Sequence, residues 1–196
     1  MKILVFDDNE LHRSAAVSML GKDHELTVVG TYKEAEEAVE SGRWDAVLTD
    51  LMTKPSDSLA MPTNHPDLIS VKDTEMPLGN FIVLIAMTRG IKKIGLMTDT
   101  NHHKHPASAA LDPLLAKKRI GTGIMDPCEP KPFVLGDIKL VFANSSSSDN
   151  AVFVNPANYE CMTDEEADAK YPNREDCKDF LRSKNWKLLL DVLIRD

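Results

Sequence analysis

The chain has 196 residues and a formal net charge of -8, with 31 acidic against 23 basic side chains. This length suits one enlarged domain or a core domain with an appendage, and the acidic balance argues against a nucleic-acid surface, which needs a basic stripe. No run approaches the roughly eighteen apolar residues of a membrane span. The three cysteines are widely spaced without a CxxC pair, and acids interrupt the short apolar start. We therefore expect a cytoplasmic protein without a disulfide framework, a zinc site or a membrane anchor.

The first fifty residues alternate between strand and helix patterns. Apolar runs of strand length occupy residues 2–6, 26–30 and 44–50. Asn9 can cap a helix that ends near Gly21, and Thr31 with Glu34 has the capping-box spacing of a second helix, which stops at Gly42. Strands and helices joined by such short loops predict a parallel sheet covered by helices on both faces.

Two of these strands end on carboxylates. Asp7 and Asp8 follow the first strand, and Asp50 is the last residue of the third. Parallel strands end at the same edge of the sheet, where the loops that follow them form a crevice. The sequence therefore predicts a site built from these three acids.

The segment from 52 to 77 interrupts the pattern. It has prolines at positions 55, 62, 66 and 77 among short polar residues, and it shows no sustained period. Loops of this length within a compact domain are uncommon. Because the segment follows Asp50, we expect either a lid over the carboxylates or a surface insertion without a role.

Regular patterns resume after this insertion. Residues 78–89 predict an apolar helix, and residues 93–98 predict a fourth strand that ends on Thr98. Pro106 can open a helix over 107–117, which Pro113 would kink or end. The fifth strand stays open between residues 119–125 and the runs 133–135 and 138–143, which flank a Gly136-Asp137 hairpin turn.

The last fifty residues indicate an extension of the core. Serines at 145–148 predict a flexible connection, and the apolar pattern between 180 and 193 predicts one or two helices that dock on the sheet. We expect an α/β fold with a doubly wound parallel sheet of five core strands, an added β-hairpin and a C-terminal helix. The core domain would span 1–144, with the insertion at 52–77, and the linker and helical extension would span 145–196.

Clustered carboxylates need a cation, because they repel one another. Oxygen ligands of this kind suit Mg2+, and a hard dication prepares a neighbouring carboxylate to attack a phosphoryl group. Such a site also calls for a hydroxyl and a lysine to bind the phosphoryl oxygens. Thr98, at the end of the fourth strand, and Lys131 are the candidates.

Four stretches carry a family resemblance: Phe6-Asp7-Asp8-Asn9, Leu48-Thr49-Asp50-Leu51-Met52, Met97-Thr98 and Lys131-Pro132-Phe133. Together they resemble the receiver domain of two-component response regulators, most closely over residues 1–52. The resemblance implies a flavodoxin-like, receiver-like fold. It also implies that Asp7 and Asp8 hold Mg2+ and that Asp50 accepts a phosphoryl group.

The resemblance implies roles for further residues as well. The main-chain carbonyl of Met52 would complete the metal ligands, Thr98 would be the switch hydroxyl, and Lys131 would pair with the phosphoryl group. If the fifth strand is instead 138–143, Lys131 lies in a hairpin and the phosphate-pairing lysine is absent. The implied partners are a histidine kinase or phosphotransfer protein and a downstream protein, with no nucleic acid and no membrane.

The histidine-rich loop that follows Thr98 is the other unusual cluster. His102, His103 and His105 would hang over the same crevice and could bind a transition metal or take part in phosphoryl chemistry. No Cys or Glu completes a recognisable metal-site spacing, so the alternative is a polar loop that only shapes the site.

Three functional hypotheses remain open. The first is a receiver-like phosphoacceptor that acts through protein–protein contacts. The second is an enzyme on a flavodoxin-like fold, a metal-dependent phosphohydrolase or a nucleotide-binding enzyme, that uses the same carboxylates with the insertion as a lid. The third is a degenerate receiver that binds partners without being phosphorylated.

Overall fold

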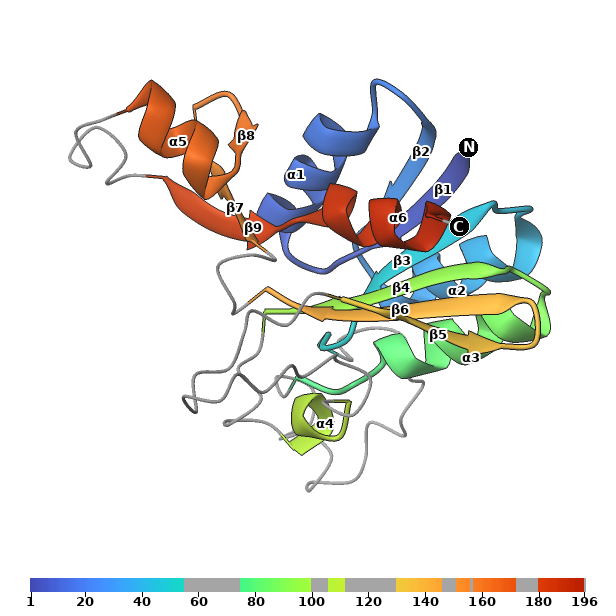
Figure 1. Cartoon of the computed structure of the whole chain (residues 1–196). Helices are drawn as coiled ribbons and strands as arrows, with labels where there is room; N and C mark the ends of the chain where they lie inside the picture. Colours follow the sequence, from blue (N-terminus) through green and yellow to red (C-terminus); the bar gives the residue numbers. More distant parts are fainter. Residues whose placement is uncertain are drawn as a thin grey trace.

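The computed structural model describes residues 1–54, 75–99, 106–111, 130–145, 151–155, 157–171 and 180–195 (Figure 1). Its strands are β1 (Lys2–Phe6), β2 (Glu25–Val29), β3 (Ala46–Asp50), β4 (Lys93–Thr98), β5 (Pro132–Leu135), β6 (Ile138–Asn144), β7 (Ala151–Val154), β8 (Cys161–Met162) and β9 (Leu181–Lys184). Its helices are α1 (Glu10–Leu20), α2 (Tyr32–Ser41), α3 (Gly79–Thr88), α4 (Pro106–Ala109), α5 (Asp164–Lys170) and α6 (Trp186–Ile194).

A mostly parallel sheet of six strands forms the centre of this α/β fold. Its strand order is β2-β1-β3-β4-β6-β5, and only β5 runs antiparallel to its neighbour. The predicted hairpin is confirmed, since β6 pairs with β4 inside the sheet and β5 forms the edge. The rival run 119–125 lies outside the described residues.

Local sequence signals explain the first two helices. The Asn9 side chain accepts a hydrogen bond from the amide of Leu11 at the start of α1. Thr31 and Glu34 form both halves of the predicted capping box at the start of α2. These caps satisfy backbone amides that have no partner within the helix.

Helices cover both faces of the six-stranded sheet (Figure 1). On one face, side chains such as Leu4 and Val47 pack against α2 and α3. On the other face, side chains such as Ile3 and Leu48 pack against α1 and α6. Each central strand thus contributes alternate residues to two apolar cores, as expected for a sheet that is buried on both sides.

A second, three-stranded sheet has the order β8-β7-β9 and is antiparallel. Val152 and Val154 of β7 pack against Ala15 of α1, which fixes this sheet beside the main one. From β9 the chain enters α6, and Gly95 allows that helix to approach β4 closely, since a Cβ there would lie 2.6 Å from Leu189 Cδ2. No helix in the described ranges is long and apolar enough to cross a membrane.

Candidate functional site

The ends of β1 and β3 bring three carboxylates together. The parallel register pairs Phe6 with Thr49, so the chain delivers Asp7, Asp8 and Asp50 to the same edge of the sheet. Each of the three acids places a carboxylate oxygen within 4.8 Å of the others. Asp7 and Asp50 are buried, whereas Asp8 is exposed. The predicted cluster is therefore present, with one side open.

A buried lysine lies against this cluster. Lys184, the last residue of β9, places Nζ 2.6 Å from Asp7 Oδ2 and 2.8 Å from Asp50 Oδ1. Its side chain is fully buried. One ammonium faces two buried carboxylates, so these three groups have a net charge of about -1 when ionised. Asp8 adds a further negative charge at the open side.

The charge balance explains the shifted pKa values. Burial raises the pKa of Asp50 well above its ordinary value; Lys184 opposes this shift and Asp7 adds to it. Burial alone would lower the pKa of Lys184, but Asp50 and Asp7 outweigh burial and raise it. Lys184 therefore stays charged, and the two buried acids compete for it.

The donor set fits a divalent cation of the Mg2+ type. One carboxylate oxygen from each of Asp7, Asp8 and Asp50 lies within 4.8 Å of the other two, and oxygen is the ligand atom that this cation prefers. A dication there would also neutralise the excess negative charge. The exposed position of Asp8 leaves room for the water ligands that Mg2+ usually keeps.

The turn after β3 holds Asp50 tightly. Its Oδ1 accepts a 3.3 Å hydrogen bond from the amide of Met52, and the amide of Gly79 at the start of α3 donates to the carbonyl of Leu51. A Cβ on Gly79 would lie 1.9 Å from the Asp50 carbonyl oxygen. Only glycine permits this close approach of α3, so Gly79 sets the position of the Asp50 backbone.

A hydrogen-bonded chain fixes the strand that carries Lys184. His12 Nδ1 lies 2.9 Å from Ser183 Oγ, and His12 Nε2 lies 3.4 Å from Asp99 Oδ2. Trp186 Nε1 donates to the carbonyl oxygen of His12. The hydrogen bond to His12 lowers the pKa of Asp99 to about 2. These contacts tie β9 and α6 to α1 and to the end of β4.

The structure separates the predicted lysine from the acids. Lys131 is exposed just before β5, and strands β4 and β6 separate β5 from β3. It lines a different surface pocket, with Lys139 and Val192. The prediction that Lys131 reaches the Asp50 carboxylate is wrong, because its strand lies at the far edge of the sheet. Lys184 takes that place.

The sequence did not identify Lys184, because the strand that carries it has only a weak strand pattern. The strand Leu181-Arg182-Ser183-Lys184 has a single apolar residue, and it pairs with β7 in a separate sheet. The usable signal was its position directly before Asn185, which caps the apolar helix α6. A lysine at the end of a strand and before a capped helix is a candidate for a sheet-edge site.

The other predicted residues are placed in part. Thr98 is buried at the end of β4, one residue beyond Met97, the partner of Asp50 in the sheet. Met52 is buried beside Asp50; that its carbonyl binds the metal stays a prediction. The predicted histidine cluster, residues 102, 103 and 105, and most of the 52–77 insertion lie outside the described residues.

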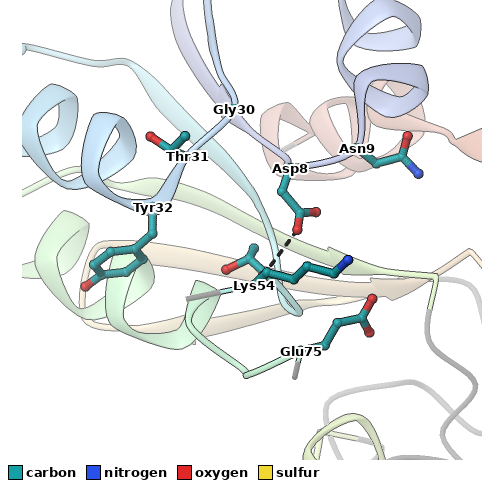
Figure 2. Close-up of a pocket in the computed structure, with 8 residues that line it drawn as sticks. Asp8, Asn9, Gly30, Thr31, Tyr32, Lys54 and Glu75 are labelled. Carbon is teal, nitrogen blue, oxygen red and sulfur yellow. Dashed lines mark hydrogen bonds between the residues drawn. The ribbon is translucent and has the colours of Figure 1, made fainter. Parts of the chain in front are cut away.

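A pocket of about 440 Å³ adjoins the acid cluster at Asp8 (Figure 2). One wall comes from the loops before α1 and α2, and the other from the chain on either side of the insertion. The lining residues are Asp8, Asn9, Gly30, Thr31, Tyr32, Thr53, Lys54 and Glu75. The open side of the acid cluster thus leads into a space of small-molecule size.

No family model matches the chain, and the curated proteins contain no detectable relative.

Proposed function

We propose that this protein is a receiver-like signalling module on a flavodoxin-like fold, in which Asp50 accepts a phosphoryl group in a Mg2+-dependent reaction. Asp7 and Asp8 would hold the metal together with Asp50. The donor would be a histidine kinase or a phosphotransfer protein, and the signal would pass to a downstream protein. The strand order β2-β1-β3-β4-β6 supports the fold assignment. In doubly wound sheets of this type, β2 is added on one side of β1, and β3 and the strands after it are added on the other side.

The single observation that carries this proposal is the position of Lys184. Its Nζ lies 2.8 Å from Asp50 Oδ1 and 2.6 Å from Asp7 Oδ2, without access to solvent. A lysine at this place can pair with an oxygen of a phosphoryl group on Asp50. Two buried carboxylates share this one ammonium, so the three groups keep a net negative charge that a metal ion would offset.

The reaction is a phosphoryl transfer between two nucleophiles. An oxygen of the Asp50 carboxylate attacks phosphorus, a new O–P bond forms, and the N–P bond of a phosphohistidine donor breaks. The electron pair of that bond stays on the imidazole nitrogen, which leaves the donor histidine neutral or protonated by solvent. Bound Mg2+ would supply positive charge that offsets the repulsion between the two anions.

The contacts of β9 suggest how the modification is sensed. A phosphoryl group on Asp50 offers Lys184 a dianionic partner in place of the carboxylate oxygen it holds now. Lys184 ends β9, and the preceding residue, Ser183, contacts His12. A shift of Lys184 would therefore act on the second sheet and on α6, which are the proposed contact surface for the downstream protein.

The pocket beside Asp8 favours a second candidate, a metal-dependent phosphohydrolase. The same carboxylates could act on a small phosphate ester that enters the pocket of about 440 Å³. This candidate differs in its product, since it releases inorganic phosphate continuously and leaves the protein unmodified.

Intact-protein mass spectrometry tests the proposal. The native chain is incubated with acetyl phosphate and Mg2+, and Asp50→Asn is the matched variant because it keeps the size of the side chain. We expect one phosphoryl group on the native chain, none on Asp50→Asn and none when EDTA removes Mg2+. An unmodified native chain that releases phosphate from small esters would support the phosphohydrolase, and an unmodified inactive chain would contradict both.

A further inference from the structure

Strand β5 is an apolar edge of the main sheet. It pairs with β6, and no other strand in the described ranges lies beside it (Figure 1). Phe133, Val134 and Leu135 are 48%, 58% and 54% exposed. Consecutive half-exposed apolar residues are unusual on an edge strand, because natural proteins guard such edges against pairing with another chain. Strand β5 therefore offers a surface that a further strand can cover.

The backbone of Val134 points away from β6. Val134 lies opposite Lys139 in the hairpin, and the amide of Lys139 donates to the carbonyl of Lys92, on the side of β4. In an antiparallel ladder, pairs that direct their backbone groups outwards alternate with pairs that bond to each other. The amide and the carbonyl of Val134 therefore face the open edge, as does the carbonyl of Pro132 two residues earlier.

Pro132 limits how this strand can pair with a second copy of itself. Antiparallel registers that place Pro132 opposite itself or opposite Val134 lose hydrogen bonds, because proline has no amide hydrogen. With a two-fold axis at Val134, the two Val134 residues exchange both hydrogen bonds, and Gly136 lies opposite Pro132. The hairpin ladder closes at Leu135 and Ile138, so the amide of Gly136 can donate to the Pro132 carbonyl of the second copy.

The apolar side chains match in this register. Phe133 lies opposite Leu135 of the second copy, which forms an aromatic–aliphatic pair on one face of the sheet. On the other face the two Val134 side chains meet, beside a surface groove of about 380 Å³ that Val134 and Val192 help to line. The half-exposed residues of β5 would thus be covered on both faces.

The charges also match, although they do not enter the choice of register. Lys131 lies opposite Asp137 of the second copy, so an ion pair of opposite charges forms at each end of the paired strands. In the single chain Lys131 is exposed, and Asp137 contacts Lys92 over 2.6 Å. An exposed ion pair of this kind favours the register without supplying most of the affinity.

We propose that two copies of this chain associate through β5, antiparallel and about a two-fold axis at Val134, so that their six-stranded sheets become one continuous sheet. A two-fold contact closes on itself and covers both β5 edges. One four-residue strand from each copy makes a small interface, so we expect a dimer that dissociates in the range of about 1 to 100 µM. This inference depends neither on the metal site nor on phosphorylation of Asp50.

Sedimentation equilibrium and hydrogen exchange on the full chain test the inference. We expect the molar mass to rise reversibly from that of one chain towards that of two between about 1 µM and about 1 mM. The amide of Val134 should exchange rapidly in the monomer and at least about tenfold more slowly in the dimer. The amide of Phe133, which faces β6, is the internal control and should be protected at both concentrations.

Variants at Val134 test the axis. Val134→Pro removes the outward amide and keeps the hairpin bonds, so it should raise the dissociation constant at least about tenfold. Val134→Lys places two like charges opposite each other and should have a similar effect. The matched control is Val17→Lys on α1, where the valine is 53% exposed, and it should leave the association unchanged.

A charge reversal tests the register. Lys131→Glu places two acids opposite each other at each end of the contact, so it should weaken association about three- to tenfold. Lys33→Glu changes the net charge equally at an exposed position of α2, and it should leave the dissociation constant unchanged. Equal effects of the two variants would contradict the pairing of Lys131 with Asp137.

The remaining outcomes decide whether a second copy covers β5. A chain that stays monomeric up to about 1 mM overturns the inference. A dimer that persists in Val134→Lys uses another surface, which also overturns it. A monomer whose Val134 amide is protected at low concentration would show that another part of the same chain covers the edge. Circular dichroism verifies the fold of each variant, and Val134→Lys decides the matter if Val134→Pro does not fold.

Discussion

The two sheets contribute to the site in different ways. The six-stranded sheet supplies Asp7, Asp8 and Asp50 from the ends of neighbouring parallel strands, β1 and β3. The three-stranded sheet supplies one residue, Lys184, from the end of β9. The acids are held by the main fold itself, whereas the lysine depends on how a second sheet docks on α1.

The two parts of the site are therefore held in different ways. The Asp50 backbone is fixed by hydrogen bonds within the main sheet and by the approach of Gly79. Lys184 is held by its two carboxylates and, through the neighbouring Ser183, by His12. We therefore expect a charge change at Asp50 to act first on Lys184 and on the position of β9 relative to the main sheet.

Removing the lysine should have the largest effect. Lys184→Met leaves Asp7 and Asp50 buried without their cation, so we expect the free energy of unfolding to fall by about 3–5 kcal/mol without metal. Mg2+ should restore part of this loss, because a dication can replace the ammonium. Urea denaturation with and without Mg2+ measures both effects.

The control for that variant is Lys131→Met, which removes the lysine first expected at the site. Because Lys131 is exposed, its replacement should change the free energy of unfolding by less than about 0.5 kcal/mol. Similar losses for the two variants would contradict the assignment of the site to Lys184.

A substitution at Gly79 should disturb the acidic residues that the main sheet supplies, because Gly79 contacts the backbone of Asp50. Gly79→Ala places a Cβ against the Asp50 carbonyl, so α3 or the end of β3 must shift. We expect a loss of about 1–3 kcal/mol, as for other overpacked sites, and weaker Mg2+ binding. The matched control is Gly136→Ala in the β5–β6 turn, where a Cβ meets no atom within 4 Å although its positive φ carries a smaller strain. Unchanged Mg2+ affinity in Gly79→Ala would show that this approach does not set the site.

The raised pKa of Asp50 predicts a dependence on pH. Without metal, the folded chain binds more protons than the unfolded chain between the ordinary carboxyl pKa and the raised value. Stability should therefore fall as the pH rises through this window. Asp50→Asn should remove this part of the slope and leave the metal-free protein more stable at neutral pH.

Bound Mg2+ should oppose this fall of stability with rising pH. Mg2+ binds the ionised carboxylates, so its affinity should fall as the pH is lowered into the range where Asp50 takes up a proton. Titrations of Mg2+ at several pH values measure this effect. An affinity that does not change with pH would contradict the raised pKa.

The smallest effect on stability is expected from the contact between His12 of α1 and Asp99, which directly follows β4. The hydrogen bond from His12 lowers the pKa of Asp99 to about 2, so the stabilisation is present above about 4 and is lost as the pH falls from there to about 2. His12→Ala should raise the pKa of Asp99 towards its ordinary value, as followed by carboxyl 13C NMR. Asp137, whose lowered pKa comes from Lys92, is the internal control and should not change.

Much of the central fold was predictable because its signals are local. The buried strands β1 and β3 carry the apolar runs Ile3–Phe6 and Ala46–Leu48, and the capping residues Asn9 and Thr31 start helices at the expected places. The three-stranded sheet was not predicted, because its strands are short and β9 pairs with β7 from far along the chain, Ala151 with Lys184. The C-terminal helix was predicted from its apolar residues, and α6 does pack on the main sheet.

The candidate site also has a part that the sequence predicts and a part that it does not. Asp7, Asp8 and Asp50 follow from strand ends, which sequence patterns locate well. The lysine could not be chosen in this way, since Lys131 stands beside a stronger strand pattern than Lys184 does. The decisive information is the docking of α6 and β9, which depends on contacts such as the hydrogen bond from Trp186 to His12.

Trapping of the modified residue tests the central claim most directly. Borohydride reduces an aspartyl phosphate to homoserine, so the chain is treated with acetyl phosphate and Mg2+, reduced, digested and analysed by peptide mass spectrometry. We expect homoserine at position 50, dependent on Mg2+ and absent from Asp50→Asn. Homoserine at Asp7 or Asp8, or no reduced residue while Mg2+ is bound, would contradict the role of Asp50 as the phosphoacceptor.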